Sequence, residues 1–243
     1  MRANSIRLFV DHTPDAGGEI ACTRGQANYL MNVMRLQSGA ELLIFDGRTG
    51  EWRAELVVQG RARCALQPLQ RVREQAAGPD VEYLFAPLKR ARLDYMVQKA
   101  TELGVAALQP VLTQHTAVAR VNSERMRANV IEAAEQCGVL RIPDVRAPAP
   151  LDALLRDWDA ERPIIYCDED APIASPLEAL QRTEPGPLAV LIGPEGGFDE
   201  AERNRLRSLP FVTPVSLGPR VMRADTAAVA ALALVNAVLG DWQ

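Results

Sequence analysis

From residue 81 onward, short apolar runs alternate with segments of helical periodicity, and this alternation constrains the possible fold more than any other feature. The runs suit strands buried on both faces, and the segments between them carry apolar residues on one side. The runs cover residues 81–85, 106–112, 164–167, 188–192 and 212–217. Such repetition favours a doubly wound α/β domain with a mostly parallel sheet and a ligand at the carboxyl ends of its strands. We assign residues 79–243 to this domain.

Helical segments between the strands have recognisable ends. Leu93 to Leu103 forms an apolar stripe that Gly104 closes, and a second helix extends from Ser123 to Gly138. Asp199 with Glu202 three residues later is typical of a capping box, so a third helix is expected through Leu209. A last helix is expected from Thr226 to Leu239, and it is apolar almost all round.

Residues 1–73 have a different pattern of apolar residues, and this pattern predicts a small β-barrel. Short β-type runs cover residues 6–10, 41–45, 52–58 and 62–69, with glycine-containing turns between them. One helical stretch covers residues 25–35, and the residues 76–79 indicate a linker. The chain is therefore expected to hold two domains, 1–73 and 79–243.

Charge is divided unevenly between these domains. The 243-residue chain has a net charge of −4, which argues against a general nucleic-acid binder and against DNA as a partner. Residues 1–73 carry +3, with arginine as the only basic residue type, and the remainder carries −7. Since arginine suits phosphate groups, two interpretations of the first domain stay open: a contact with RNA phosphates, or a solvated surface.

Several classes of protein are not expected. The apolar run nearest in length to a membrane span, residues 227–239, is too short, and no signal-peptide pattern opens the sequence. The four cysteines lie far apart and only two histidines are present, so we expect reduced thiols, a cytoplasmic protein and no metal site.

Two glycine-containing segments are candidates for ligand binding. Ile192-Gly193-Pro194-Glu195-Gly196-Gly197-Phe198 follows a predicted strand and precedes a predicted helix. Glycines there allow close approach of the backbone to a ligand, and a side chain at Gly196 is expected to block it. The segment has neither the spacing of a dinucleotide fingerprint nor the lysine of a phosphate loop. The alternative is a tight turn without a ligand.

The second segment, residues 215–228, joins the final strand to the final helix. Arg220 and Arg223 lie three residues apart between a Gly-Pro turn and a helix start, where they could hold a phosphate or a carboxylate. Alternatively, Asp225 and Thr226 only cap the helix and both arginines face solvent.

Together, residues 192–198 and 216–228 closely resemble the motifs of the RsmE family of 16S rRNA uridine-N3 methyltransferases, which belongs to the SPOUT superfamily. The resemblance extends over the rest of the chain, through residues 87–105 and 132–138, the tripeptide Arg7-Leu8-Phe9 and residues 32–36. Two positions depart from it: Val139 and His115 stand where many relatives have arginine.

The resemblance implies a PUA-like barrel that contacts rRNA, followed by a SPOUT domain with a deep trefoil knot. It implies S-adenosylmethionine as the cofactor, S-adenosylhomocysteine as its product, and a homodimer. The substrate it implies is a decoding-region uridine of 16S rRNA in the small ribosomal subunit. Two alternatives stay open: a silent rRNA-binding assembly factor, and a SPOUT methyltransferase that acts on another RNA position.

The resemblance also implies roles for individual residues of this chain, where they match the family's motifs. Arg223 is expected to stabilise a uracil oxygen as the ring becomes anionic, and Glu195 to accept a proton or to bond local amides. Expected RNA contacts are Arg7, Arg35, Lys89, Arg90 and Arg92. The acidic run Asp168-Glu169-Asp170 is expected to be a solvated loop. The cofactor loops comprise Ile192, Gly193, Pro194, Glu195, Gly196, Gly197, Ser216, Leu217, Gly218, Arg220, Val221 and Met222.

Overall fold

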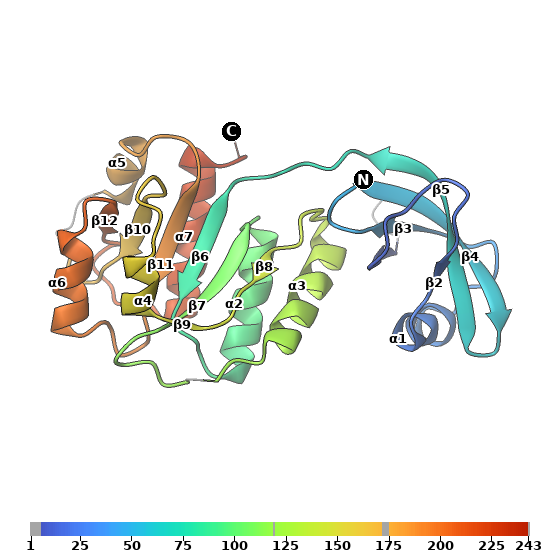
Figure 1. Ribbon diagram of the computed structural model, residues 1–243, viewed down its shortest axis with the longest axis horizontal. Helices are drawn as coiled ribbons and strands as arrows, with labels where there is room; N and C mark the ends of the chain where they lie inside the picture. Colours follow the sequence, from blue (N-terminus) through green and yellow to red (C-terminus); the bar gives the residue numbers. More distant parts are fainter. Residues whose placement is uncertain (1–5, 119, 172–174, 243) are drawn as a thin grey trace. The chain divides into compact units, whose positions relative to one another are not determined.

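The computed structural model describes residues 6–118, 120–171 and 175–242, and the chain divides into two compact units (Figure 1). The first unit contains Met1–Ala76 together with Ala134–Arg141. The second contains Ala77–Ala133 and Ile142–Gln243. The end of one helix, beyond residue 133, thus packs with the N-terminal unit although it lies far from that unit in the sequence.

The first unit is a curled five-stranded sheet with one short helical segment. Strand β1 pairs in parallel with β3, and the other neighbours pair antiparallel in the order β1-β3-β4-β5-β2. Inward-facing residues of the strands and of the helical segment form one apolar core. The strands are β1 (Arg7–Phe9), β2 (Ile20–Ala21), β3 (Glu41–Phe45), β4 (Glu51–Gly60) and β5 (Arg63–Arg73).

The helical segment of this unit changes its hydrogen-bonding pattern part-way. Thr23 and Gln26 form a capping box, so α1 (Arg24–Asn28) begins with its first amides satisfied. The chain then continues as a π-helix, η1 (Tyr29–Val33), a rare form that often accompanies functional sites. Leu30 is fully buried, whereas Val33 and Met34 are exposed.

Arg7 holds the first unit together from within. Its side chain is 10% exposed, and its Nε donates a hydrogen bond to Glu51 at 2.6 Å. The same guanidinium donates to the backbone oxygens of Glu135 (3.1 Å) and Val139 (3.2 Å), and it lies 4.4 Å from the centre of the Phe45 ring. Arg7 therefore attaches the end of a helix to the first strand of the sheet.

The second unit is built on a parallel sheet. The strand order is β12-β10-β11-β6-β7-β8, with β9 also paired to β7, and every ladder between these strands is parallel. The strands are β6 (Val81–Phe85), β7 (Ala107–Leu112), β8 (Asp144–Val145), β9 (Ala149–Pro150), β10 (Ile164–Cys167), β11 (Leu188–Ile192) and β12 (Val212–Val215).

Helices cover both faces of this sheet (Figure 1). Apolar residues of α2, α3, α5 and α7 form one core with one face of the strands, and residues of α4 and α6 form another with the opposite face. The helices are α2 (Arg90–Glu102), α3 (Ser123–Cys137), α4 (Leu151–Arg156), α5 (Pro176–Gln181), α6 (Glu200–Ser208) and α7 (Ala224–Leu239). Within the described residues, no helix is long and apolar enough to span a membrane.

This architecture confirms the fold class that the sequence predicted: a parallel α/β sheet flanked by helices, preceded by a curled N-terminal sheet. The predicted helices at 93–103, 123–138, 199–209 and 226–239 correspond to α2, α3, α6 and α7. The last helix begins at Ala224, two residues before the predicted start. Helices α4 and α5 and the short strands β2, β8 and β9 were not predicted.

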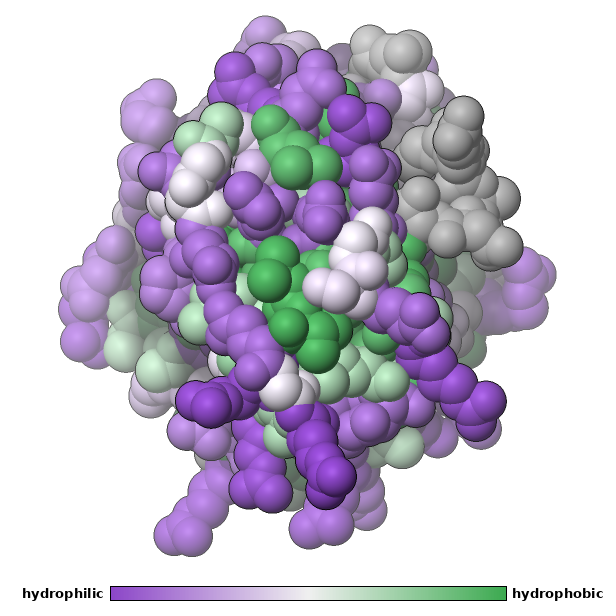
Figure 2. Space-filling view, turned by 90° about the vertical axis from the view of Figure 1, so that its right-hand side faces the viewer, coloured by the Kyte–Doolittle hydropathy of each residue, from purple (hydrophilic) through white to green (hydrophobic). Residues whose placement is uncertain are grey.

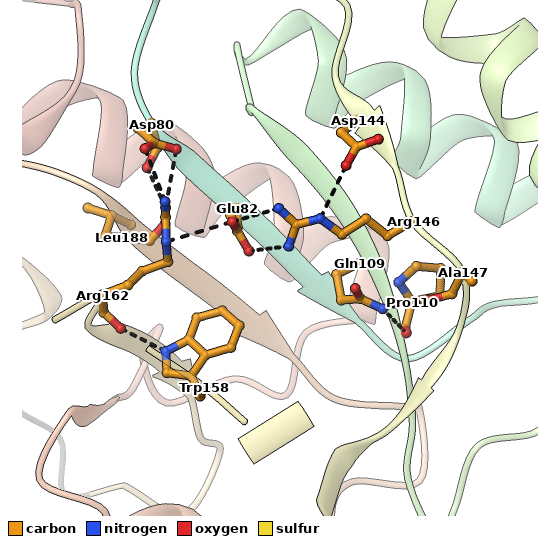
Figure 3. A network of polar contacts seen from close by, with 10 residues as sticks. All are labelled: Asp80, Glu82, Gln109, Pro110, Asp144, Arg146, Ala147, Trp158, Arg162 and Leu188. Atoms are coloured by element: carbon orange, nitrogen blue, oxygen red, sulfur yellow. Dashed lines mark hydrogen bonds and ion pairs between the residues drawn. The ribbon is translucent and has the colours of Figure 1, made fainter. Parts of the chain in front are cut away.

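A buried carboxylate is neutralised at the amino-terminal edge of the parallel sheet (Figure 3). Glu82, the second residue of β6, is 7% exposed. Arg146 binds both of its oxygens at 2.7 and 2.8 Å, and Arg162 Nε lies 3.7 Å away. Arg162 also pairs with Asp80 at 3.0 Å. An unpaired carboxylate at such a position would be costly, so these arginines are structural residues.

Exposed apolar side chains occur on the first unit. Figure 2 views the molecule from the side on which β2, β4 and α1 lie in Figure 1, and hydrophobic residues gather at the centre of this face among hydrophilic ones. Among the described residues of this unit, the large hydrophobic side chains that are exposed are Val33, Met34, Val58, Leu69 and Val72.

We predict that Arg146→Met lowers the free energy of unfolding by about 2 kcal/mol, because Glu82 would keep only its longer contact with Arg162. Urea denaturation of the full chain measures this change. Arg182→Met at the C-cap of α5, whose guanidinium is exposed and 3.8 Å from Glu178, is the matched control and should change stability little. Equal stability of the two variants would contradict a structural role for Arg146.

Candidate active site

The carboxyl ends of β10, β11 and β12 meet at one edge of the sheet. Cys167, the last residue of β10, lies between Ile192 of β11 and Val215 of β12 in the parallel register. The loops that leave these strands therefore emerge side by side. They contain the acidic run 168–170, the glycine-rich segment 193–198 and the segment 216–223.

These loops enclose a cavity of about 280 Å³ in the second unit. Its lining is apolar at the strand ends, and the polar groups lie on the loops. The cavity includes every predicted cofactor residue except Glu195 and Gly196. The lining residues are Tyr166, Cys167, Asp168, Glu169, Ile192, Gly193, Pro194, Gly197, Phe198, Arg203, Val215, Ser216, Leu217, Gly218, Pro219, Arg220, Val221, Met222 and Ala227.

The glycines of the second loop are not equivalent. A Cβ atom at Gly193 would overlap the ring of Phe198, and Gly197 has a left-handed φ of 70°. A Cβ at Gly197 would also lie 2.9 Å from Glu169 Oε1. At Gly196 a Cβ would make only ordinary contact, 3.5 Å from His115 Cβ. The loop itself therefore needs glycine at positions 193 and 197, and the expectation that a side chain at Gly196 blocks a ligand stays a prediction.

The outer side of this loop is attached to neighbouring elements. Arg92 of α2 forms an ion pair with Glu195, which joins two residues that the sequence analysis had assigned to RNA contact and to proton transfer. His115 Nδ1 lies 3.1 Å from the backbone oxygen of Gly197. The backbone N–H of Gln114 donates to Glu202 at 2.8 Å. Contacts from α2 and from the segment after β7 thus hold the loop in place.

The start of α6 is fixed as the sequence predicted. Asp199 accepts a hydrogen bond from the N–H of Glu202 at 2.7 Å, and Glu202 accepts one from the N–H of Asp199 at 3.1 Å. This reciprocal capping box fixes the direction in which the chain leaves the glycine-rich loop.

The expectation of a solvated acidic loop after β10 was wrong for Asp168, whereas Glu169 and Asp170 are exposed. Asp168 is 3% exposed and binds Arg207 of α6 at 2.5 and 2.8 Å. Asp170 forms an ion pair with Arg203, one helical turn before Arg207. Arg203 lines the cavity, and its buried Nε has no hydrogen-bond partner among the described residues. Sequence reasoning missed both arginines because their partners lie more than 30 residues away in the sequence.

The third loop presents two arginines without partners in the described part of the chain. Ser216 Oγ accepts a hydrogen bond from the N–H of Gly218 at 3.2 Å and shapes the turn. Arg220 lines the cavity and is exposed, and Arg223 is the exposed N-cap residue of α7, with no side-chain capping bond. Both guanidinium groups are therefore available to a ligand.

Neutral side chains form the floor of the cavity. Burial raises the pKa of the Cys167 thiol to about 12, so Cys167 is a neutral thiol at physiological pH and not a nucleophile. Burial also raises the pKa of the Tyr166 hydroxyl. The ionised groups that line the cavity belong to the loops and to α6.

The residues predicted to contact RNA fall into two sets. Arg35, Lys89 and Arg90 are exposed and have no side-chain partner among the described residues. Arg35 adopts a left-handed φ of 54°, an unfavourable conformation for a residue with a Cβ. Arg7 and Arg92 instead bind within the protein, Arg7 in the core of the first unit and Arg92 at Glu195.

Comparisons with known proteins agree with this organisation. A family model described as RNA methyltransferase domain matches residues 76–236, and a model described as RNA methyltransferase PUA domain matches residues 23–68. The ribosomal RNA small subunit methyltransferase E of Synechocystis is 34% identical over 97% of this chain and 78% of its own length. The chain belongs to this RNA methyltransferase family.

Other members are similar along nearly the whole chain. The family's Bacillus subtilis protein is 28% identical over 95% of both chains. The structure of the Neisseria gonorrhoeae enzyme bound to S-adenosyl methionine has a TM-score of 0.88 at 25% identity, covering 99% of this chain and 100% of that one. A putative methyltransferase from Legionella pneumophila, in complex with the same cofactor, has a TM-score of 0.86 at 27% identity over 98% and 100%.

We predict that Gly193→Ala destabilises the protein and Gly196→Ala does not. The new methyl group at position 193 must displace the Phe198 ring, which should lower the free energy of unfolding by about 1–3 kcal/mol. The methyl group at position 196 meets His115 at an ordinary contact distance, so the change there should stay within about 0.5 kcal/mol. Urea denaturation compares the two variants, and a larger loss at Gly196 would contradict the loop geometry.

Proposed function

We propose that this chain transfers the methyl group of S-adenosylmethionine to N3 of a uridine in 16S rRNA. By family membership it is an S-adenosylmethionine-dependent rRNA methyltransferase. The choice of a uridine, and of its N3 atom, is what we propose beyond family membership. The observation that carries the proposal is the cavity at the ends of β10, β11 and β12, because both family motifs line it.

The residues around the cavity fit this cofactor. Ile192, Leu217 and Met222 provide apolar surface for a flat adenine ring, and the glycine-rich loop lets backbone groups come close. The exposed guanidinium of Arg220 is a donor for a carboxylate. We assign the cofactor to this cavity, bounded by residues 192–197 and 216–222.

When bound, S-adenosylmethionine supplies a methyl group on a positively charged sulfur. In the transfer, the bond from N3 to the methyl carbon forms, the bond from that carbon to sulfur breaks, and sulfur keeps the electron pair. Uracil N3 attacks only after it has lost its proton to solvent water, so negative charge spreads onto the neighbouring ring oxygens. Arg223, whose guanidinium is exposed next to the cavity residue Met222, stabilises this charge.

We assign Glu195 to positioning. Its carboxylate is paired with Arg92 and lies outside the cavity lining, so it holds the glycine-rich loop in the conformation that receives the cofactor. His115 supports the same loop through the oxygen of Gly197. A preformed loop reduces the free energy that cofactor binding would otherwise spend on ordering it.

For the RNA we propose contacts with the exposed side chains of Arg35, Lys89 and Arg90. Phosphate groups are the partners that such basic residues bind most often. We further propose a homodimer through α7, since the outer face of this helix keeps Val229, Ala233 and other small apolar residues half-buried. With 16S rRNA as its substrate, the protein would act in the cytoplasm.

The test is transfer of a labelled methyl group to 30S particles and to naked 16S rRNA, followed by nucleoside analysis. The proposal expects label in 3-methyluridine from at least one of the two substrates. Label in another nucleoside would show a different RNA methyltransferase. Cofactor and rRNA binding without any transfer would show a silent assembly factor.

We predict that Arg223→Ala lowers kcat about 10²-fold, because an electrostatic contact made mainly in the transition state is removed. The affinity for S-adenosylhomocysteine should stay the same, as calorimetry can show. Arg205→Ala on the exposed side of α6 is the control for the loss of one positive charge. A variant that loses cofactor affinity but keeps its kcat would contradict the assigned role.

We predict that replacing Arg35, Lys89 and Arg90 together by alanine weakens RNA binding and lowers the slope of log affinity against log salt by about three, one per phosphate contact. Filter binding of 16S rRNA over a salt series measures both quantities. Arg182→Ala, which also removes an exposed charge, should leave the slope unchanged. A triple variant with the wild-type slope would show that these side chains are only solvated.

A further inference from the structure

One carboxylate on the cavity wall has no protein partner. Asp168 is bound to Arg207 and Asp170 to Arg203, so the residues on both sides of Glu169 are tied to α6. In addition, Asp168 accepts a hydrogen bond from the backbone N–H of Asp170 at 3.1 Å. Glu169 lies between these two tethers and lines the cavity, and its carboxylate has no hydrogen bond or ion pair among the described residues.

The position of Glu169 follows from the sheet. Cys167 is paired with Ile192 in the β10–β11 ladder, so Glu169 lies two residues beyond the end of one strand and the glycine-rich loop begins just beyond the end of its neighbour. Glu169 Oε1 is 2.9 Å from the place that a Cβ of Gly197 would occupy. The carboxylate therefore lies directly beside the backbone of the loop.

This arrangement has a known chemical use. A carboxylate only accepts hydrogen bonds, and its two oxygens suit two adjacent hydroxyl groups. In dinucleotide-binding sheets, an acidic residue near a glycine-rich loop at the carboxyl ends of the strands accepts a bond from a ribose hydroxyl. The fold of the second unit is different, but the same two groups are placed side by side.

We propose that Glu169 binds the ribose of the adenosyl group by accepting hydrogen bonds from its hydroxyls. This inference rests on the proposed function, because it needs S-adenosylmethionine in this cavity. Glu169 then fixes the depth and rotation of the nucleoside and, through it, the direction of the methyl group. Its role is to position the cofactor and to select ribose over deoxyribose.

The sulfonium, a positively charged group of the cofactor, suits Glu169 less well than the ribose hydroxyls do. A carboxylate against the sulfonium would stabilise the charged reactant more than the transition state, in which that charge is being neutralised, and would slow the transfer. Ribose hydroxyls do not change during the reaction. Moreover, Arg203 Nη2 lies 3.9 Å from the same Cβ position at Gly197, and its positive charge disfavours a cation there.

Calorimetry with the full-length chain tests the inference. The probes are S-adenosylhomocysteine and its two analogues that lack the 2′- or the 3′-hydroxyl. Glu169→Ala should bind S-adenosylhomocysteine about tenfold more weakly than the wild type does, since hydrogen bonds to a charged group are lost. The wild type should bind at least one analogue about as weakly as Glu169→Ala binds S-adenosylhomocysteine. Glu169→Ala should bind that analogue almost as tightly as it binds S-adenosylhomocysteine. Glu178→Ala on α5 is the control and should bind like the wild type.

Two results would overturn the inference and leave the proposed function intact. One is wild-type affinity for S-adenosylhomocysteine in Glu169→Ala, and the other is an equal loss of affinity for the analogues in both proteins. A larger loss for S-adenosylmethionine than for S-adenosylhomocysteine would also overturn it, because it would place Glu169 at the sulfonium. Failure of the wild type to bind either cofactor form would instead contradict the proposed function. Thermal unfolding of each variant without ligand verifies that it is folded.

Discussion

The parallel register of three strands is the constraint on which the rest of the site depends. Because Cys167 lies between Ile192 and Val215, the chain leaves β10, β11 and β12 at one edge, and three loops distant in the sequence share one cavity. Parallel strands need long connections, so helices cover both faces of the sheet. The buried pairing of Glu82 with Arg146 stabilises the opposite edge.

The loops are held from outside the cavity, and this leaves groups inside it without partners. Arg92, Gln114 and His115 contact the glycine-rich loop or the start of α6. Arginines of α6 neutralise Asp168 and Asp170 and leave Glu169 on the cavity wall. Attachment of this kind preorganises a site, because the free energy of ordering the loops is supplied by folding and not by the ligand.

Much of the fold follows from patterns that extend over several residues. The buried runs of β6, β7, β10, β11 and β12 and the long helices are evident in the sequence because each has a clear period and recognisable ends. Strands of two residues (β2, β8 and β9) and helices of six residues, less than two turns (α4 and α5), carry too little pattern. The predicted helix at 25–35 changes into a π-helix at Tyr29, which no periodicity indicates.

In the site, glycines and motif arginines could be predicted. The binding partners of Arg7, Arg92 and Asp168 could not be predicted, because only the fold brings those partners close.

The central claim is that the cavity between the loops after β10, β11 and β12 receives the adenosyl cofactor in a preformed shape. A crystal structure of the full chain with S-adenosylhomocysteine tests it most directly. The account predicts the ligand between residues 192–197 and 216–222, with Glu169 at the ribose and the pair of Arg92 and Glu195 intact. A ligand bound elsewhere, or a glycine-rich loop that rebuilds its backbone on binding, would contradict it.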